Sequence, residues 1–240
     1  MSKIFKNLAD ITRIQMPAAT RTWQPVSQVQ LFNSMCDAIR DRGFTITSES
    51  HRVHHKKPVF ISQVEIEAPG LPGGKEMRWN IAGMQSWNKT VPVKLLFGGT
   101  VLVCTNGMVV AEHILKTKHT TNVWSRLEPM IEQTVDLFES QVNRTFGFYQ
   151  QMKDVRGTHT TLCDFAVRVA AKDYLPKTQI LDLVQEAENP SFDYGTNAGS
   201  VYNIHAAFTH LLKTANPLEA PSRLLGFERE LKDHYELAAV

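Results

Sequence analysis

The spacing of apolar residues changes near residue 123, and this change limits the fold more than any other feature of the sequence. Before it, Val64 and Ile66 alternate with the polar Glu65 and Glu67, which is typical of a half-buried strand. After it, apolar side chains recur every three or four residues over 127–149, which predicts one amphipathic helix of about seven turns. We therefore expect an α+β protein, with a helix-backed antiparallel sheet in the N-terminal half and a helical layer in the C-terminal half.

Local signals place the individual elements. Ser27 is the N-cap of a predicted amphipathic helix that Gly43 ends in the left-handed conformation. Strands are predicted over residues 44–53, 59–67, 76–84, 93–97 and 101–105. The dipeptide Asn106-Gly107 predicts a hairpin turn. Further helices are predicted over residues 158–170, 176–184, 201–212 and 228–237, and the N-terminal arm is read as polar and irregular.

The size of the chain bounds its organisation. With 240 residues and 42% hydrophobic content, we expect a single α+β domain over 1–240, sheet-rich and basic over 27–122 and helical and acidic over 123–240. No stretch reaches the roughly 18 apolar residues that cross a bilayer, and the N-terminus has no apolar signal region. The sequence thus predicts a cytoplasmic protein that does not enter a membrane.

The charge of the two halves differs, although the net charge is only +2. Residues 1–120 hold 15 Lys and Arg against 8 Asp and Glu, and residues 121–240 hold 11 against 16. Such a split is typical of a nucleic-acid-binding part joined to an acidic part. It equally suits head-to-tail contacts between subunits, or two solvated surfaces without a role, and the sequence leaves these alternatives open.

Cationic and aromatic residues of the first half form the predicted binding site. Single-stranded nucleic acid is held by cations that pair with phosphates and by exposed rings that stack on bases. Trp87 lies in a polar turn and is predicted to be an exposed stacking ring, whereas Trp79 is expected in the sheet core. The predicted phosphate contacts are Arg52, Lys56, Lys57, Arg78, Lys89, Lys94, Lys116 and Lys118. His51, His54 and His55 are expected to add positive potential to the basic turn that contains Lys56.

Catalytic and metal-binding patterns are lacking in the sequence. The nine histidines have no HExxH, Cys-His or paired-carboxylate spacing, and the glycine pairs match neither a P-loop nor GxGxxG. Cys36, Cys104 and Cys163 form no CxxC pair and are predicted to be buried thiols. We therefore predict no enzyme activity, no metal and no cofactor, while an active site assembled only in three dimensions stays an alternative.

The sequence contains three short motifs, which are Gln85-Ser86-Trp87-Asn88-Lys89-Thr90, Val103-Cys104-Thr105-Asn106-Gly107-Met108 and Lys118-His119-Thr120-Thr121-Asn122. Together they resemble those of a family found on phages, prophages and plasmids, the domain of unknown function 932. Trp87 and Asn88 stand where the family has His-Asp, and His210 stands where Glu is common. The resemblance implies a mobile-element protein of a bacterial cytoplasm and supplies no activity.

The order of elements is also similar to the core of single-strand annealing proteins of phage recombination, which form rings or filaments. The favoured hypothesis is therefore binding or annealing of single-stranded DNA in recombination or replication, with a homo-oligomeric ring or filament left open. The alternative is an anti-defence or host-takeover protein that contacts a host protein and does not bind DNA. Its interface is predicted on an acidic helix stripe, namely Glu128, Glu132, Asp136 and Glu139.

Overall fold

The computed structural model describes residues 2–5, 8–54, 58–67, 70, 72, 77–101, 113–193, 196, 199–212, 215 and 219–237. The chain divides into two compact units. Unit 1 comprises Met1–Leu71, Arg78–Gly99 and His113–Val142, and unit 2 comprises Pro72–Met77, Thr100–Glu112 and Asn143–Val240. The helix α3 (Val123–Asp154) contributes its first part to unit 1 and its last part to unit 2.

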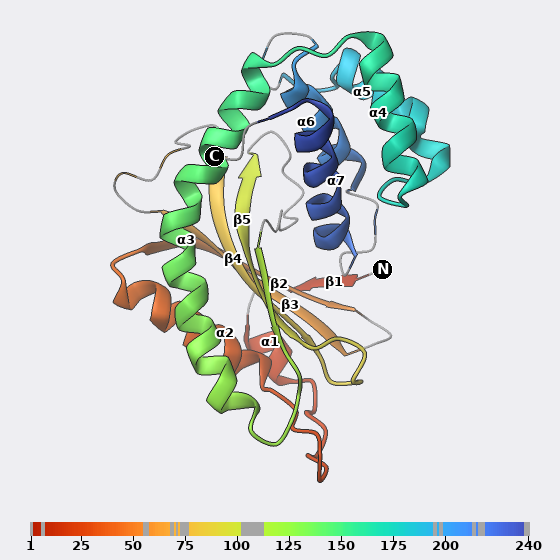
Figure 1. Ribbon diagram of the computed structural model, residues 1–240. Coiled ribbons are helices and arrows are strands. Elements are labelled where there is room, and N and C mark those ends of the chain that lie inside the picture. The colour runs from red at the N-terminus through yellow and green to blue at the C-terminus, as the bar shows by residue number, and fades with distance from the viewer. Residues whose placement is uncertain are drawn as a thin grey trace. The chain divides into compact units, whose positions relative to one another are not determined.

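Unit 1 is built on a sheet whose strands follow one another in chain order (Figure 1). The strands are β1 (Ser2–Phe5), β2 (Thr45–His54), β3 (Val59–Glu67), β4 (Met77–Ser86), β5 (Val93–Val101) and β6 (His113–Thr117). β1 with β2, β2 with β3, β3 with β4 and β5 with β6 pair antiparallel. Antiparallel neighbours can be joined by short connections, as from β2 through β5, whereas residues 6–44 separate β1 from β2.

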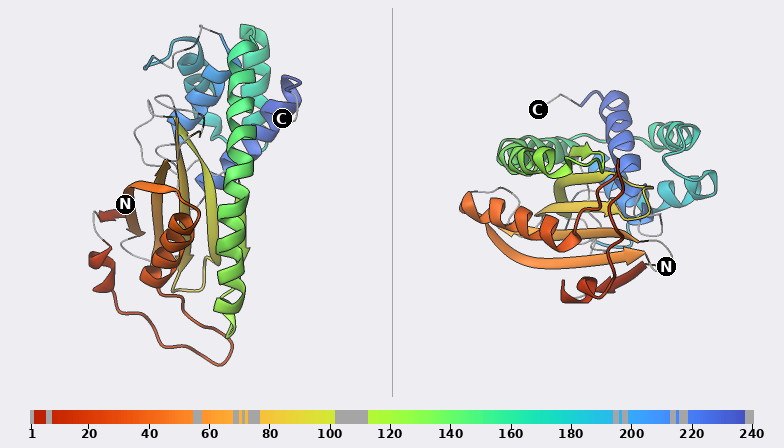
Figure 2. Two further views of the ribbon diagram at one scale, coloured as in Figure 1. Left: turned by 90° about the vertical axis from the view of Figure 1, so that its left-hand side faces the viewer. Right: turned by 90° about the horizontal axis from the view of Figure 1, so that it is seen from below.

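Helices cover one face of this sheet, which we call the helix face (Figure 2). α1 (Ala9–Thr12) and α2 (Gln28–Asp41) precede β2. A Cβ on Gly83 of β4 would lie 3.1 Å from Leu31 and Met35 of α2, so this glycine permits close packing of helix on sheet. Phe138 of α3 meets Phe44, Trp79 and Phe97 edge to face, at ring centroid distances of 5.5, 6.4 and 6.2 Å.

The opposite face, here the second face, follows from the alternation of side chains along each strand. Since Trp79 and Phe97 point to the helix face, their even-numbered neighbours on β4 and β5 point away from it. The strand register extends this assignment across the sheet. The second face carries Arg52, Ile61, Glu65, Arg78, Asn80, Ala82, Met84, Lys94, Leu96 and Lys116.

Unit 2 is helical. It holds the last part of α3, α4 (His159–Ala171), the short η1 (Lys177–Gln179), α5 (Ile180–Glu188), α6 (Val201–Leu211) and α7 (Ala220–His234). Its core stacks Phe208 on Phe227 at 3.7 Å, and Phe165 meets Phe227 edge to face at 5.3 Å. The buried His205 of α6 pairs with Glu228 of α7 at 2.9 Å. No helix in the described part of the chain is long and apolar enough to cross a membrane.

The predicted α+β class is confirmed, and so are the expected helix after Ser27 and the positive φ of Gly43, which is 77°.

Two strands were not predicted from the sequence. β1 lies in the segment read as an irregular arm, because four residues are too few to show a period. β6 has only five residues, which are likewise too few to show a period. α7 begins at Ala220 rather than 228, with Pro221 in its first turn, where a missing N–H costs nothing. The predicted hairpin at Asn106-Gly107 lies outside the described residues.

Candidate nucleic-acid interface

Three chain segments meet at one end of the sheet of unit 1. They are the loop before α2, the turn between β4 and β5, and the segment between β6 and α3. The indole Nε1 of Trp87 donates to the Val26 carbonyl at 2.7 Å. The Gln24 N–H donates to the His119 carbonyl at 3.3 Å. Two of the three motifs in the sequence, residues 85–90 and 118–122, are thereby joined through residues 23–28.

The first motif builds a buried polar framework. Gln85 donates from Nε2 to the Val26 carbonyl at 2.8 Å and to Oε1 of Gln28 at 3.0 Å. Ser86 Oγ accepts from the Val91 N–H at 2.8 Å and donates to the Val91 carbonyl at 3.1 Å. Gln85 and Ser86 are fully buried. Paired polar groups of this kind hold a turn in one conformation, because leaving any of them unpaired is costly.

The prediction that Trp87 is exposed is wrong, since its side chain is only 8% exposed. Its ring lies 4.4 Å from that of Phe60 and packs in a cluster with Ile11 and Val53. Polar neighbours in the sequence suggested a surface turn. The indole is instead buried, and its Nε1 donates a hydrogen bond to the carbonyl of Val26, 61 residues away in the chain. Trp79, expected in the core, is 3% exposed.

His119 of the second motif is also part of the framework. Its side chain is buried, its ring lies 5.9 Å from that of Trp23, and Nδ1 is 3.2 Å from the Gln24 carbonyl oxygen. Burial lowers the pKa of His119, against smaller opposing effects of hydrogen bonds to Gln24 and Val91. The ring is therefore neutral near pH 7.

Lys89 occupies a strained position in the same framework. Its φ is 66°, the left-handed conformation that side chains other than glycine adopt at a cost. This conformation places Nζ 5.1 Å from the centroid of the Trp23 ring, within range of a cation–π contact. The lysine is exposed while its aromatic neighbour is buried.

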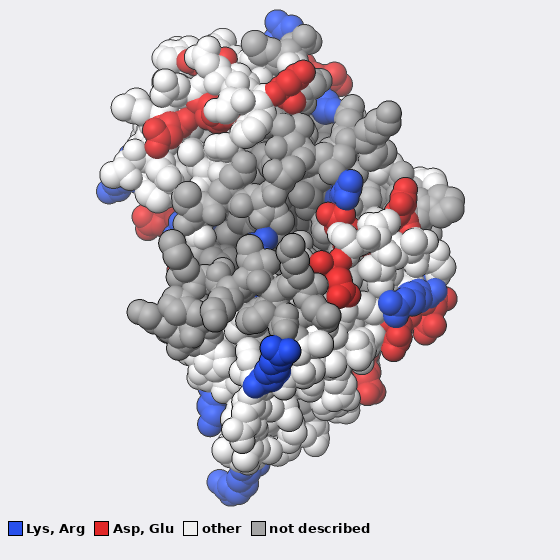
Figure 3. Space-filling model, turned by 180° about the vertical axis from the view of Figure 1, so that it is seen from behind, with Lys and Arg blue, Asp and Glu red and all other residues white. Residues whose placement is uncertain are grey.

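Four exposed cations gather around the framework, and we call them the basic end. They are Arg21, Lys89, Lys118 and Arg126. Arg126 Nη2 donates to the Lys118 carbonyl at 3.4 Å and also binds Oγ1 of Thr120. Among the described residues no carboxylate forms an ion pair with any of the four. The lower tip of the face in Figure 3 likewise shows blue side chains and no red ones.

The basic end is cationic because its segments lack acids. The sequence has no Asp or Glu over 11–36, over 77–111 or over 113–127. Each of these stretches contributes one of the three converging segments. The next carboxylate along the chain is Glu128, which is exposed on the second turn of α3. Unpaired cations on one surface add their potentials and attract polyanions.

The other predicted cations that the structure describes lie on the second face of the sheet, where Lys116 alone is both exposed and without a carboxylate partner among the described residues. Arg78 pairs with Glu65 at 2.7 Å. Lys94 lies directly opposite Lys116, and burial together with the charge of Lys116 lowers the pKa of Lys94. Burial also lowers the pKa of Arg52. Apolar residues of this face are buried as well, namely Ala82, Met84 and Leu96. Lys56 and Lys57 lie outside the described residues.

One partly exposed aromatic ring at this end was not predicted from the sequence. Trp124 is half-buried, whereas Trp23, Trp79 and Trp87 are buried. It stands in the first turn of α3, two residues before Arg126. The sequence did contain a signal for its exposure. Trp124 follows the buried Val123 and lies on the side of the helix that carries Glu128.

The acidic stripe of the alternative hypothesis is partly occupied within unit 1. Arg42 binds Glu132 at 2.6 Å and Asp136 at 2.7 Å. These hydrogen bonds, first the one to Asp136, raise the pKa of Arg42. Glu128 is exposed, and the side chain of Glu139 lies outside the description. Two of the four carboxylates thus join α3 to the end of α2.

His51 was predicted in a basic turn, and this prediction is wrong. The ring is 0% exposed, and burial lowers its pKa. Nδ1 is 2.9 Å from Ser62 Oγ, which also accepts from Gln28 Nε2 at 2.8 Å, and Nε2 is 3.5 Å from Glu49. Ser62, His51 and Glu49 follow one another in the order of a catalytic triad. Ser62 is fully buried, however, so its hydroxyl cannot reach a substrate. His54 and His55 lie in the part where side chains are not described.

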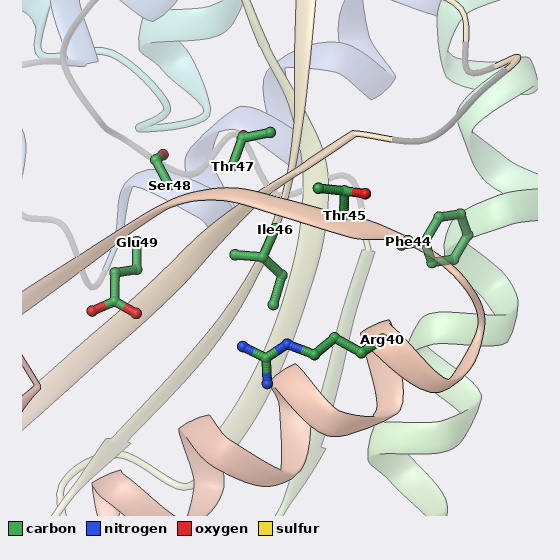
Figure 4. Close-up of a pocket in the computed structure, with 7 residues that line it drawn as sticks. All are labelled: Arg40, Phe44, Thr45, Ile46, Thr47, Ser48 and Glu49. Carbon is green, nitrogen blue, oxygen red and sulfur yellow. The ribbon is translucent and has the colours of Figure 1, made fainter.

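A shallow pocket of about 510 Å³ lies beside β2, away from both motifs (Figure 4). Arg40 of α2 and Glu49 of β2 line it together with Phe44, Ile46 and hydroxyl residues. Arg40 already pairs with Asp37 at 3.4 Å. The lining offers neither a nucleophile with a base nor a pair of carboxylates, so it has no catalytic geometry.

Metal-binding and thiol groups were also located. No three His, Cys, Asp or Glu side chains of the described residues are arranged to hold a metal ion. Cys36 is buried, as predicted, and burial raises its pKa to about 11. The prediction of a buried thiol is wrong for Cys163, which is half-exposed on α4. Cys104, with the motif 103–108, lies outside the description.

The comparison with known proteins gives one match. No curated protein and no solved structure matches this chain. The model of one family, described as a domain of unknown function (DUF932), matches residues 17–211. That span includes the loop before α2, both joined motifs and the helices through α6. The chain belongs to the DUF932 family.

Proposed function

We propose that this protein binds single-stranded DNA at the basic end. The observation that carries the proposal is the convergence of three acid-free segments, which bring Arg21, Lys89, Lys118 and Arg126 to one end of the sheet. All four side chains are exposed. Lysine and arginine bind phosphates by releasing the counterions that surround them, and this release favours association at low salt.

Pairing separates these four residues from two other cations of unit 1. Arg42 and Arg78 are held by carboxylates at 2.6–2.7 Å. A cation in such a pair must lose its partner before it contacts a phosphate, and the lost contact offsets the gain. The exposed cations of the basic end carry no such cost.

Trp124 supports single-stranded DNA as the ligand. Its ring is half-buried and stands in the first turn of α3, which begins at the end of the sheet that carries the four cations. A partly accessible indole at that end can stack on an unpaired base, which contributes about 1–3 kcal/mol. In duplex DNA the bases are already stacked on each other, so the ring has no equivalent partner.

The proposal also covers the cellular location, the genetic origin and the role of the protein. We place the protein in the bacterial cytoplasm, encoded by a mobile element, with a role in recombination or replication. A ring or filament of several copies would align several basic ends along one strand, since each copy contributes only a short patch.

The test is binding of labelled single-stranded and duplex oligonucleotides, followed by fluorescence anisotropy over a range of salt concentrations. The variant carries Lys89→Gln, Lys118→Gln and Arg126→Gln. For single strands, loss of three phosphate contacts should reduce the slope of log K against log salt by about 2.

The matched control carries Arg78→Gln, Lys94→Gln and Lys116→Gln, which removes the same charge from the second face. It should retain the slope of the wild-type protein. Equal changes in both variants would show that net charge alone attracts the DNA. Absence of binding by the wild-type protein at low salt would overturn the proposal.

A further inference from the structure

We propose that Cys163 is an activated thiol, and that it forms with His159 and Glu188 a surface site for oxidation by hydroperoxides. The site lies in unit 2, remote in sequence from the basic end, and does not depend on nucleic-acid binding. The three side chains form a continuous relay from thiol to imidazole to carboxylate.

The relay has hydrogen-bond geometry at both steps. Cys163 Sγ is 3.5 Å from Nε2 of His159, and Nδ1 of the same ring is 2.5 Å from Oε1 of Glu188. A nucleophile beside a base, with the base held by a third group, is the arrangement that activates thiols in proteins. Here the carboxylate fixes the ring so that Nε2 faces the sulfur.

The fold brings the three residues together from two helices that lie side by side (Figure 1). His159 and Cys163 are four residues apart on α4 and therefore share one face of that helix. Glu188 is the last residue of α5. Thr158 begins α4 with a capping box, so the position of His159 in the first turn is well defined.

The site is open to small reagents. The side chains of His159 and Glu188 are 68% and 36% exposed, and Cys163 is half-exposed. Such a surface suits a reagent without a binding pocket, which is why we choose a hydroperoxide rather than a large substrate.

A metal site does not explain this cluster. His159 uses one ring nitrogen for the thiol and the other for the carboxylate. The two nitrogens of imidazole point in different directions, so the sulfur and the carboxylate cannot meet at one ion on this ring. The three residues serve proton transfer instead.

The reaction follows from the relay. Nε2 of His159 takes the thiol proton, and the thiolate attacks the terminal oxygen of the hydroperoxide. The S–O bond forms as the O–O bond breaks, and the imidazolium proton goes to the departing oxygen. The sulfur is oxidised to a sulfenic acid and the hydroperoxide is reduced to an alcohol, or to water when hydrogen peroxide is used.

The experiment measures alkylation by iodoacetamide at pH 7 and sulfenic acid formation with hydrogen peroxide, trapped by dimedone, with both adducts located by peptide mass spectrometry. His159→Gln should slow both reactions of Cys163 about tenfold, because the base is lost. Glu188→Gln should slow them about threefold by freeing the ring, and Glu188→Asp should restore part of the rate.

Two controls are built into the chain. Asp164→Asn removes the exposed carboxylate next to Cys163 and should not slow its reactions. Cys36 is buried and reports folding, since it reacts only when the protein unfolds. If Cys36 reacts in a variant, the comparison is made between native and urea-unfolded wild-type protein. Cys163 reacting no faster in the native protein than after unfolding, or equally fast with His159→Gln, would overturn the proposal.

Discussion

The basic end and the second face of the sheet each carry four lysines or arginines, but only at the basic end are all four exposed and without a carboxylate partner among the described residues. At the basic end the four cations are exposed and no described carboxylate pairs with them. On the second face Arg78 is bound to Glu65, while burial lowers the pKa values of Arg52 and Lys94. The two surfaces have the same number of cations but differ in the burial and pairing of those cations.

The difference shows what a binding surface needs beyond charge. The basic end stands on a rigid framework in which Gln85, Trp87 and His119 are buried and hydrogen-bonded. The motif residues in the interior hold the turns, and neighbours such as Lys89 present the charge. Substitutions within the framework should therefore change stability, whereas substitutions of its exposed cations should change binding.

The largest effect is expected from Trp87→Ala. Removing a buried indole that packs on Phe60 and donates to Val26 should lower the free energy of unfolding by about 3–5 kcal/mol. Urea denaturation followed by circular dichroism measures this loss. Unchanged stability together with weakened DNA binding would break the distinction between framework and binding residues.

Trp124→Ala is the counterpart at the exposed surface. It should weaken single-strand binding by about 1–3 kcal/mol, because one stacked base is lost. Its affinity for duplex DNA should change less. Anisotropy with both ligands provides the comparison, and equal losses would show that the ring does not stack on bases.

Acidification separates the buried histidines from the exposed cations. The folded-state pKa values of His51 and His119 lie below the unfolded value near 6.5, so the unfolded chain binds protons first as the pH falls. Their contribution to stability is complete above about pH 7 and declines below it, at up to about 1.4 kcal/mol per pH unit for each ring. Urea midpoints at pH 7.5 and 5.5 test this, and His119→Gln should reduce the difference.

The smallest effect is expected from Lys116→Glu on the second face. The new carboxylate would lie opposite Lys94 and replace a like-charged pair by an attractive one. Such cross-strand pairs contribute about 0.2–1 kcal/mol. The melting temperature should rise slightly, while the salt dependence of DNA binding should stay unchanged. A reduced slope of log K against log salt would show that Lys116 contacts the DNA.

Local sequence determined most of the elements, because their signals lie within a few residues. The cap at Ser27, the turn at Gly43 and the apolar stripe along α3 specify backbone conformations with short-range interactions. The stretches without Asp or Glu are likewise visible in the sequence, and they account for the positive charge of the first half.

Only the tertiary structure decided which side chains are accessible. Trp87 was expected outside and is inside, while Cys163 was expected inside and is half-exposed. The pairing of His159 with Glu188 joins residues 29 positions apart in the chain, and the contact of Trp87 with Val26 spans 61. Burial and pairing depend on such distant partners, and no local pattern of residue types records where those partners lie.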